Sequence, residues 1–425
     1  MKEDFLQFVW LQQLFDKESF ITVSNDKIEI IKPGFLNNDS GPDFLDVKLK
    51  IGGQIWAGAV EIHLKSSDWY AHKHNLDKSY NNVILHVVGE YDKIVENEAG
   101  SEVPTAILKY DPKLYENYSR LIMNKGPIPC ANFLKDIDFF IVKAWLSRLL
   151  IERLEKKSAE VLEILKANSN YWEETFYILL ARNFGFKTNS LPFEMLAKSL
   201  PLKAIEKQKY DLKQIEALIF GQAGFLENDN DSDEYYSILK KEYDFLKVKY
   251  ELKSIDKSMW KFMRMRPANF PTIRLAQFAA ILYHNVNMFS KIIEIEDVNS
   301  IKSFFQKEVS DYWQKHYDFG KEWSRGVKKI GDKTIDIILI NSIALMIFVY
   351  GLVNENDDIK SRALELLYNI KPEKNNITQK WMDAGVEIKS AYESQAAIQL
   401  FNEYCRKGRC LNCQIGSQII IREKL

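Results

Sequence analysis

A pair of carboxylates with a histidine nearby is the part of the chain best suited to chemistry. Asp43 follows a Gly-Pro pair, and Glu61 and His63 lie eighteen and twenty positions further along. Hydrolysis of a phosphate ester needs a hard cation held by oxygen ligands, with open positions for water and for the phosphate. We therefore expect Asp43 and Glu61 to bind Mg²⁺ or Mn²⁺. His63 or Lys65 would position the attacking water and offset the charge that develops on phosphorus.

A β-hairpin is expected to bring these residues together. A glycine pair separates the strand-like runs Phe44–Ile51 and Gln54–Leu64, which is the pattern of a tight turn between antiparallel strands. Because strand side chains point alternately to opposite faces, every second residue of the second strand shares a face. The chemical face would carry Glu61, His63 and Lys65. The opposite face is apolar and would pack in the core.

These residues resemble the PD-(D/E)xK nuclease superfamily, whose signature is Pro-Asp, a spacer, and then acid-x-Lys. Pro42, Asp43 and Glu61 match this signature, whereas His63 stands at the lysine position and Lys65 follows two residues later. The resemblance implies a restriction-endonuclease-like core and metal-dependent hydrolysis of nucleic-acid phosphodiester bonds, in DNA more than in RNA. The departure at His63 leaves the catalytic base open. A nuclease-derived protein that binds nucleic acid or a partner without cleaving it is the alternative.

The expected order of elements suits that fold. An amphipathic helix opens the chain, and three strands, a helical turn and a fourth strand follow it: Phe5–Phe15, Lys27–Lys32, Phe44–Ile51, Gln54–Lys65, Trp69–Tyr80 and Val83–Val88. The stretch Gly41–Val88 also resembles an uncharacterised bacterial family that carries the same Gly-Pro-Asp-Phe and Val-Glu-Ile-His motifs. That second resemblance runs along the whole chain and implies no activity.

Histidines gather just after the acidic motif. Four of the six in the chain fall within a short stretch, namely His63, His72, His74 and His86. One interpretation is a zinc or manganese site built from His72, His74 and Asp77. On a helix the rings of His72 and His74 would point about 200° apart, so that site requires an extended segment. A second interpretation is contact with nucleic acid beside a Trp69 stacking surface, and a third is loop stabilisation. His86, in an apolar run, is expected to be a hydrogen-bonded core histidine.

Length and patterning predict an α+β protein of at least two domains. The chain has 425 residues, which exceeds the size at which a single core stops growing. Composition changes near Pro127–Cys130, so we expect a nuclease-like core over 1–128 and a mostly helical domain over 129–425. The run Ile337–Val353 is expected to be a buried core helix rather than a membrane span. With no signal peptide visible, the expected location is the cytoplasm, and Glu227–Glu234 is expected to be a solvated acidic loop.

The charge balance allows only a local nucleic-acid surface. The chain carries 58 basic and 59 acidic residues, a net charge of −1, so no overall attraction to nucleic acid exists. Within a basic stretch of the helical part, three arginines have few acidic neighbours: Arg264, Arg266 and Arg274. These are the candidates for contact with substrate phosphates. The sequence does not indicate an oligomeric state.

Three of the four cysteines cluster near the C-terminus. They are Cys405, Cys410 and Cys413, and the fourth is Cys130 at the expected domain boundary. Disulfides are improbable in a cytoplasmic chain, and the basic residues between these cysteines would favour thiolates. If Cys130 joins the other three, the set would bind zinc or an iron–sulfur cluster. This is similar to nucleases of the same superfamily that carry an iron–sulfur staple, although Cys130 follows the core. Reduced, unliganded thiols are the alternative.

Overall fold

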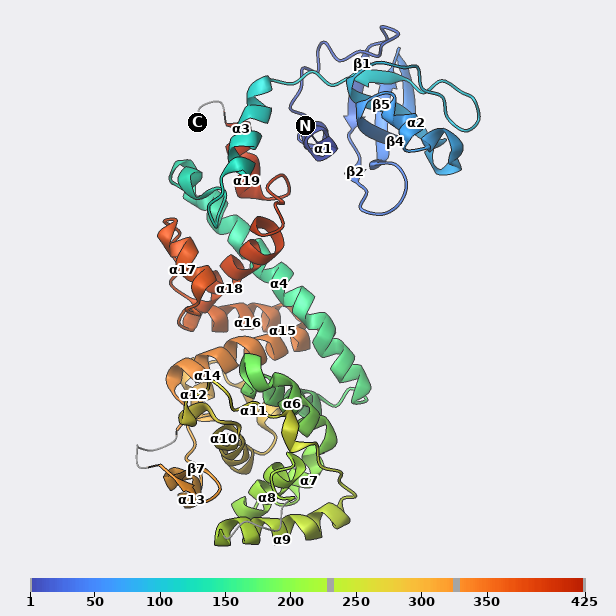
Figure 1. The fold of residues 1–425 in the computed structure, drawn as a ribbon. Helices are drawn as coiled ribbons and strands as arrows, with labels where there is room; N and C mark the ends of the chain where they lie inside the picture. The colour runs from blue at the N-terminus through green and yellow to red at the C-terminus, as the bar shows by residue number, and fades with distance from the viewer. Residues whose placement is uncertain (1, 228–232, 324–328, 423–425) are drawn as a thin grey trace. The chain divides into compact units, whose positions relative to one another are not determined.

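The computed structural model describes residues 2–227, 233–323 and 329–422, and it is a mixed α and β protein (Figure 1). The expected α+β class is therefore confirmed. Contacts divide the chain into two compact units. The first comprises Met1–Trp145, Asp383–Val386 and Phe401–Leu425, and the second comprises Leu146–Met382 and Glu387–Leu400. Most of the expected acidic loop over Glu227–Glu234 lies outside the described residues.

The C-terminal segment belongs to the first unit, which differs from the division expected at residue 128. The change between units falls within α4 (Phe139–Ala167), and the chain returns to the first unit at Phe401. There α19 (Gln414–Ile421) packs on α3 (Pro112–Met123). Three isoleucines of α19 are buried, and the Asn117 side-chain amide donates to the carbonyl oxygen of Ile420 at 3.2 Å. Burial of this apolar helix face explains why the segment leaves the helical unit.

A mixed sheet forms the core of the first unit, with α1 (Glu3–Leu11) packed on it. Its strands are β1 (Ile28–Lys32), β2 (Phe35–Leu36), β3 (Phe44–Ile51), β4 (Gln54–Lys65), β5 (Val83–Glu90) and β6 (Thr105–Ile107). The strand order is β1-β3-β4-β5-β6, and β2 pairs with β3. The β1, β3 and β4 pairings are antiparallel, whereas β4 pairs with β5, and β5 with β6, in parallel. Between β4 and β5 lie α2 (Asp68–Ala71) and two short 3₁₀ turns.

The expected hairpin is present with the expected bounds. Gly52 and Gly53 have φ angles of +56° and +90°, a left-handed pair that L-residues with side chains adopt poorly and that tight hairpin turns require. Ile51 and Gln54 pair directly across this turn. The face expected to be open is instead covered, because Glu61 is 5% exposed and its neighbours from Ala59 to Ile62 are also buried. The site therefore lies inside the unit, beside a small core that includes Trp69 and Tyr80.

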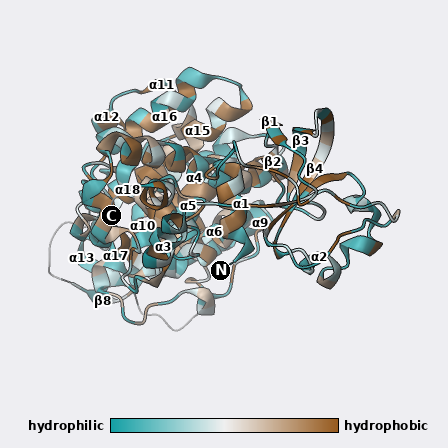
Figure 2. Ribbon diagram, turned by 90° about the horizontal axis from the view of Figure 1, so that it is seen from above, coloured by the Kyte–Doolittle hydropathy of each residue, from teal (hydrophilic) through white to brown (hydrophobic). Residues whose placement is uncertain are grey.

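The second unit is helical. Beyond α4 its helices are α5 (Trp172–Phe184), α6 (Phe186–Ser199), α7 (Leu202–Glu206), α8 (Leu212–Gln222), α9 (Glu234–Lys249), α10 (Pro271–His284), α11 (Met288–Glu294), α12 (Val298–Ser303), α13 (Asp311–Lys315), α14 (Asp332–Ile338), α15 (Ala344–Val353), α16 (Asp357–Asn369), α17 (Asn376–Asp383) and α18 (Ala391–Gln399). A small hairpin is formed by β7 (His316–Asp318) and β8 (Lys321–Glu322). Apolar and polar residues are intermixed along these helices (Figure 2), as expected where one side packs and the other meets solvent.

One helical stretch of the described chain, Asp332–Val353, is long and apolar enough to cross a membrane by length and composition alone. It includes α14, a π-helical turn and α15. However, 78% of its most apolar window is buried inside the protein. Such burial is typical of the core helix of a soluble protein, in agreement with the expectation for Ile337–Val353.

Candidate metal centre

Asp43 and Glu61 are neighbours near the start of β3, where the carboxylate of each accepts a hydrogen bond from a backbone amide at or next to the other residue. The Asp43 amide donates to Glu61 Oε2 at 2.9 Å, and the Ile62 amide donates to Asp43 Oδ2 at 3.0 Å. Both carboxylates are thus fixed by hydrogen bonds to opposite strands. Burial, followed by the charge of Glu61, raises the pKa of Asp43, as expected for a buried acid beside a second acid. Asp43 and Glu61 are therefore neighbours in the structure, and their shared binding of one ion remains a prediction.

Three histidines complete the cluster. His63, His72 and His74 each offer a ligand atom, and these atoms lie within 4.8 Å of one another. His74 Nε2 is 3.2 Å from Glu61 Oε1, and His63 Nε2 is 3.5 Å from the same oxygen. His63 Nε2 also lies 3.0 Å from His72 Nδ1. Among the described residues, no other set of three His, Cys, Asp or Glu side chains brings its ligand atoms this close together. The three ring nitrogens therefore surround a small region, and Glu61 Oε1 lies beside two of the rings, those of His63 and His74.

A left-handed residue explains how His72 and His74 reach the same place. Lys73, between α2 and the 3₁₀ turn that starts at His74, has φ +64°. This conformation breaks the helix, so that the two rings lie 5.5 Å apart between centroids rather than on opposite sides. Tyr80 stacks on the His74 ring at 3.8 Å. The requirement for a break in the helix, expected from the sequence, is thus met by a turn rather than by an extended strand.

His86 contacts the triad through the His63 ring. It is fully buried on β5, and its Nε2 lies 2.8 Å from His63 Nδ1, so the expected hydrogen-bonded core histidine is confirmed. Burial, then the neighbouring imidazoles, lowers the pKa of His63 to about 2, and burial lowers that of His86 to about 3. Both rings are therefore neutral, the form that ligates metals. If His63 Nδ1–H donates to His86, the His63 Nε2 lone pair is free to face the cluster.

Three residues expected at the site have other positions. Lys65 is exposed and pairs with Glu90 at 3.2 Å between Nζ and Oε2. Trp69 is fully buried and donates to the Glu96 carbonyl at 3.0 Å, so it offers no stacking surface to a nucleic acid. Asp77 is exposed and caps a 3₁₀ turn by accepting from the Ser79 amide. The third partner of His72 and His74 is therefore His63 or Glu61, not Asp77.

The opening helix also reaches the cluster, which no sequence motif indicated. The Gln7 side chain on α1 hydrogen-bonds to Asp43, and the Asn37 amide donates to the Asp43 carbonyl at 2.7 Å. Both residues line a polar cavity of about 430 Å³. The same cavity is lined by Lys407 and Arg409 from the cysteine-rich loop. Only the folded chain brings these three segments together, because they are far apart in the sequence.

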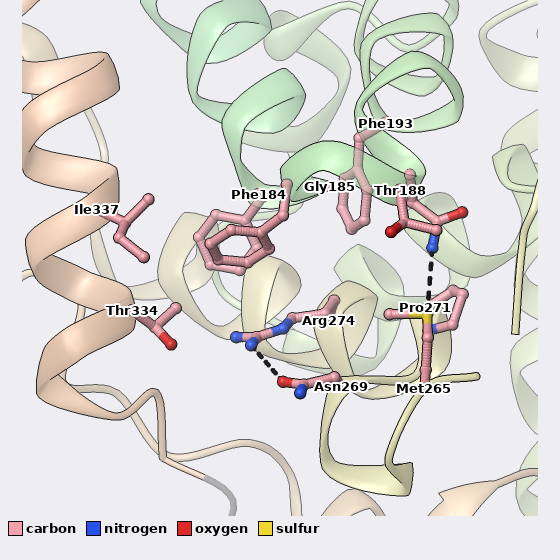
Figure 3. Close-up of a pocket in the computed structure, with 12 residues that line it drawn as sticks. Phe184, Gly185, Thr188, Phe193, Met265, Asn269, Pro271, Arg274, Thr334 and Ile337 are labelled. Carbon is pink, nitrogen blue, oxygen red and sulfur yellow. Dashed lines mark hydrogen bonds between the residues drawn. The ribbon is translucent and has the colours of Figure 1, made fainter. Parts of the chain in front are cut away.

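The three arginines do not form one surface. Arg264 and Arg266 are exposed, whereas Arg274 is only 9% exposed. Arg274 lies on α10 with its guanidinium directed into a cavity of the second unit (Figure 3). Because its side chain is enclosed by α5, α6 and α10 residues, Arg274 is not available to a nucleic-acid backbone at the surface. Some interaction other than contact with a nucleic acid must therefore account for the buried positive charge of Arg274.

All four cysteines surround one small apolar cavity. Cys130, Cys405, Cys410 and Cys413 line it together with Leu121 and Pro129, so Cys130 does join the C-terminal three. None is in a disulfide. Burial raises the pKa of each thiol, and the neighbouring thiols raise those of Cys130 and Cys405 further. This reverses the expectation that nearby basic residues favour thiolates, since Arg406, Lys407 and Arg409 lie exposed on the loop.

Comparison with known proteins identifies a family but no activity. A family model described as "Protein of unknown function (DUF2851)" matches residues 3–376. No curated protein matches the chain. No solved structure matches it either. The site geometry is therefore the basis for any functional argument.

Proposed function

The chain belongs to the DUF2851 family, and on that premise we propose from its site that it is a metal-dependent hydrolase of nucleic-acid phosphodiester bonds. The observation that carries the proposal is the convergence of Glu61 Oε1 with ring nitrogens of the triad beside Asp43. His74 Nε2 is buried and makes no hydrogen bond to a described residue, although it lies 3.2 Å from Glu61 Oε1. A buried polar atom of this kind is costly unless a ligand satisfies it, and a cation would do so.

The donor set favours Mn²⁺ or Zn²⁺ over Mg²⁺. Imidazole suits zinc and the later transition metals, whereas Mg²⁺ prefers oxygen ligands. Glu61, His63, His72 and His74 would hold the ion, with Asp43 as an adjacent carboxylate. An ion in this position supplies a Lewis acid for the phosphoryl oxygen and a nucleophilic water at neutral pH. His72 is solvent-exposed, whereas His63 and His74 are buried, so a phosphate would approach from the His72 side.

The arrangement of elements supports the nuclease class. The order α1, β1, β3, β4, α2, β5, with Asp43 before β3 and Glu61 in β4, is the order that the PD-(D/E)xK resemblance implies. The lysine of that signature has no equivalent, because Lys65 is engaged with Glu90 outside the cluster. We propose that the imidazoles take over the tasks of orienting water and balancing charge.

The substrate would meet positive charge beside Asp43. The cavity that contains Gln7 and Asn37 also contains Lys2, Lys407 and Arg409, and cations of this kind bind phosphates of a nucleic-acid strand. We expect DNA to be the better substrate and the cytoplasm to be the location. A protein that binds nucleic acid without cleaving it is the second candidate, since it needs the cations but not the metal ligands.

Cleavage assays with matched variants test the proposal. Purified full-length protein is given Mn²⁺ or Zn²⁺ and single- or double-stranded DNA or RNA. Glu61→Gln should abolish cleavage, and Glu90→Gln, an exposed glutamate on the neighbouring strand, should not. Cleavage that survives in Glu61→Gln contradicts the proposal. Binding without cleavage by the wild-type protein moves the assignment to the second candidate.

We also propose that the four cysteines hold an iron–sulfur cluster. Four sulfurs on a single zinc ion, each about 2.3 Å from it, lie within about 4 Å of one another. Among the described residues the thiols do not form a group within 4.8 Å, although they share one cavity. A cluster separates its thiolate ligands more widely than a single ion does. Iron, sulfide and zinc analysis after anaerobic purification tests this, and zinc bound without iron would contradict it.

A further inference from the structure

A second cavity lies within the helical unit and is distinct from the metal centre. It has a volume of about 280 Å³. Its walls come from the end of α5, the start of α6, the start of α10 and the Asp332–Val353 helix (Figure 3). Phe184, Phe193 and Ile337 give it an apolar side, and Arg274 and Thr334 give it a polar side. An apolar pocket with a few convergent polar groups is the usual form of a small-molecule site.

Arg274 is a buried cation for which the described part of the chain provides no counter-charge. Its Nη1 donates to Gln277 Oε1 at 3.0 Å, and its Nη2 donates to Asn269 Oδ1 at 2.7 Å. Its Nε is buried and has no hydrogen-bond partner among the described residues. The guanidinium lies 4.9 Å from the centroid of the Phe186 ring. All of these neighbours are neutral, so the positive charge is balanced by none of them.

Contact with water does not stabilise the positive charge of Arg274, because the side chain is only 9% exposed. Burial lowers the pKa of Arg274 to about 10, and no charged neighbour contributes to the shift, so the group remains a cation at neutral pH. A buried charge is costly unless it is paired and fully hydrogen-bonded. Arg274 lines the cavity, and its Nε has no hydrogen-bond partner among the described residues. An anion inside the cavity would balance the charge.

The surrounding backbone favours an anion as well. Two helices begin at the cavity: α10 at Pro271 and the 22-residue helix at Asp332. Residues of each first turn line the cavity, among them Arg274 and Thr334. Helix N-termini carry partial positive charge and free amide groups, which attract phosphates in particular. Phe186 has φ +50°, a strained conformation of the kind that persists where a site requires it.

We propose that this cavity binds a small phosphate monoester with an apolar or aromatic body. Its phosphate would pair with the Arg274 guanidinium near the two helix N-termini. Its body would lie against Phe184, Phe193 and Ile337. The planar fork of arginine suits the oxygens of a phosphate, and such charge-assisted hydrogen bonds are the strong ones. This site does not depend on the proposed hydrolase activity.

Calorimetric titration of the full-length protein tests the proposal. The titrations contain EDTA, so that the metal centre does not contribute. The probe is phenyl phosphate, with inorganic phosphate and benzoate as the other arms. We expect phenyl phosphate to bind at least about tenfold more tightly than either. Equal binding of benzoate overturns the preference for phosphate, and no detectable binding of phenyl phosphate overturns the site.

Variants locate the binding. Arg274→Gln should weaken binding of phenyl phosphate by about tenfold or more, because it removes a charge-assisted hydrogen bond. Arg266→Gln, an exposed arginine of the same segment, should leave it unchanged. Since Arg274 is buried, Thr334→Phe provides a second test: Thr334 is half-buried on the wall, and a larger side chain would fill the cavity. Undiminished affinity in a folded Arg274→Gln or Thr334→Phe protein overturns the proposal.

Discussion

Glu61 is the residue on which the proposed metal centre depends, because each of its oxygens has different neighbours. Oε2 accepts from the Asp43 amide and fixes the carboxylate, while Oε1 faces His63 and His74. Orienting one oxygen with the backbone leaves the other available as a ligand, an arrangement typical of metal-binding carboxylates. The two ring nitrogens of His63 also have separate neighbours: Nδ1 faces His86, and Nε2 faces His72 in the cluster.

His63 is expected to be essential as an imidazole. If the protein lacked only the superfamily lysine, His63→Lys would increase cleavage. The structure predicts the opposite, because the position is 1% exposed and burial of an ammonium there is costly. The ammonium would also compete with a metal ion for Glu61, which lies 3.5 Å from the His63 ring. We expect His63→Lys to lose bound metal and several kcal/mol of unfolding free energy, measured by metal analysis and urea denaturation. Lys65→Ala is the control and should keep both. Faster cleavage by His63→Lys would refute this assignment.

Glu216 provides a pH-dependent test in the helical unit. Burial raises its pKa from 4.5 to about 7, and Tyr235 donates to it. The folded state holds the Glu216 proton more tightly than the unfolded state, so protonation of Glu216 increases the free energy of unfolding. This contribution is fully present below pH 4.5 and is lost as the pH rises through 7. Glu216→Gln should gain about 3 kcal/mol relative to wild type over that range. Urea denaturation at several pH values checks this, with the exposed Glu365→Gln as control; parallel pH profiles for Glu216→Gln and wild type would contradict it.

At the scale of elements, the turn at Lys73 decides whether the histidines meet. Sequence periodicity located β3 and β4 with their observed bounds, because alternation and a glycine pair are local signals. The convergence of His72 and His74 could not be predicted in the same way. It depends on a non-glycine residue at φ +64°, a conformation that tertiary packing imposes and composition does not reveal. The positions of Gln7, Lys407 and Arg409 are likewise set by contacts between distant segments.

Substitutions of Lys73 test this turn. Glycine adopts positive φ readily, so Lys73→Gly should keep metal affinity and change the unfolding free energy by no more than about 1 kcal/mol. Lys73→Val should weaken metal binding, because a β-branched residue at positive φ is strongly disfavoured. Metal titration and urea denaturation of both variants provide the measurement. Equal metal affinity of Lys73→Val and wild type would show that the turn does not position the triad.

At the scale of the whole molecule, the C-terminal segment closes the first unit rather than extending the second. The sequence grouped residues 129–425 because helical patterns dominate there, and periodicity cannot show which core a helix joins. The four cysteines indicated the return of the chain, since Cys130 needs the C-terminal three to form a site. The same loop brings Lys407 and Arg409 to the cavity that contains Gln7. One segment thereby links the thiols to the proposed substrate side of the metal centre.

If the four cysteines hold the proposed cluster, loss of one of them should affect one unit. We expect Cys413→Ser to lower the unfolding temperature of the first unit by several degrees, because a group bound at the site stabilises only the folded state. The second unit should be unaffected, since its core contains none of these residues. Differential scanning calorimetry of the full chain gives the measurement, with Ser417→Ala on α19 as the control. An unchanged profile for Cys413→Ser would contradict a bound group.

The most direct test of the metal centre is Mn²⁺ titration of the full-length protein combined with cleavage of a labelled DNA strand in the same samples, for wild type and Glu61→Gln. We predict that wild type binds a single tightly held ion per chain at the centre and that cleavage rises with occupancy. Glu61→Gln should lose both while remaining folded. Equal ion binding by the two proteins, or cleavage that does not follow occupancy, would contradict a catalytic centre built on Glu61 and the three histidines.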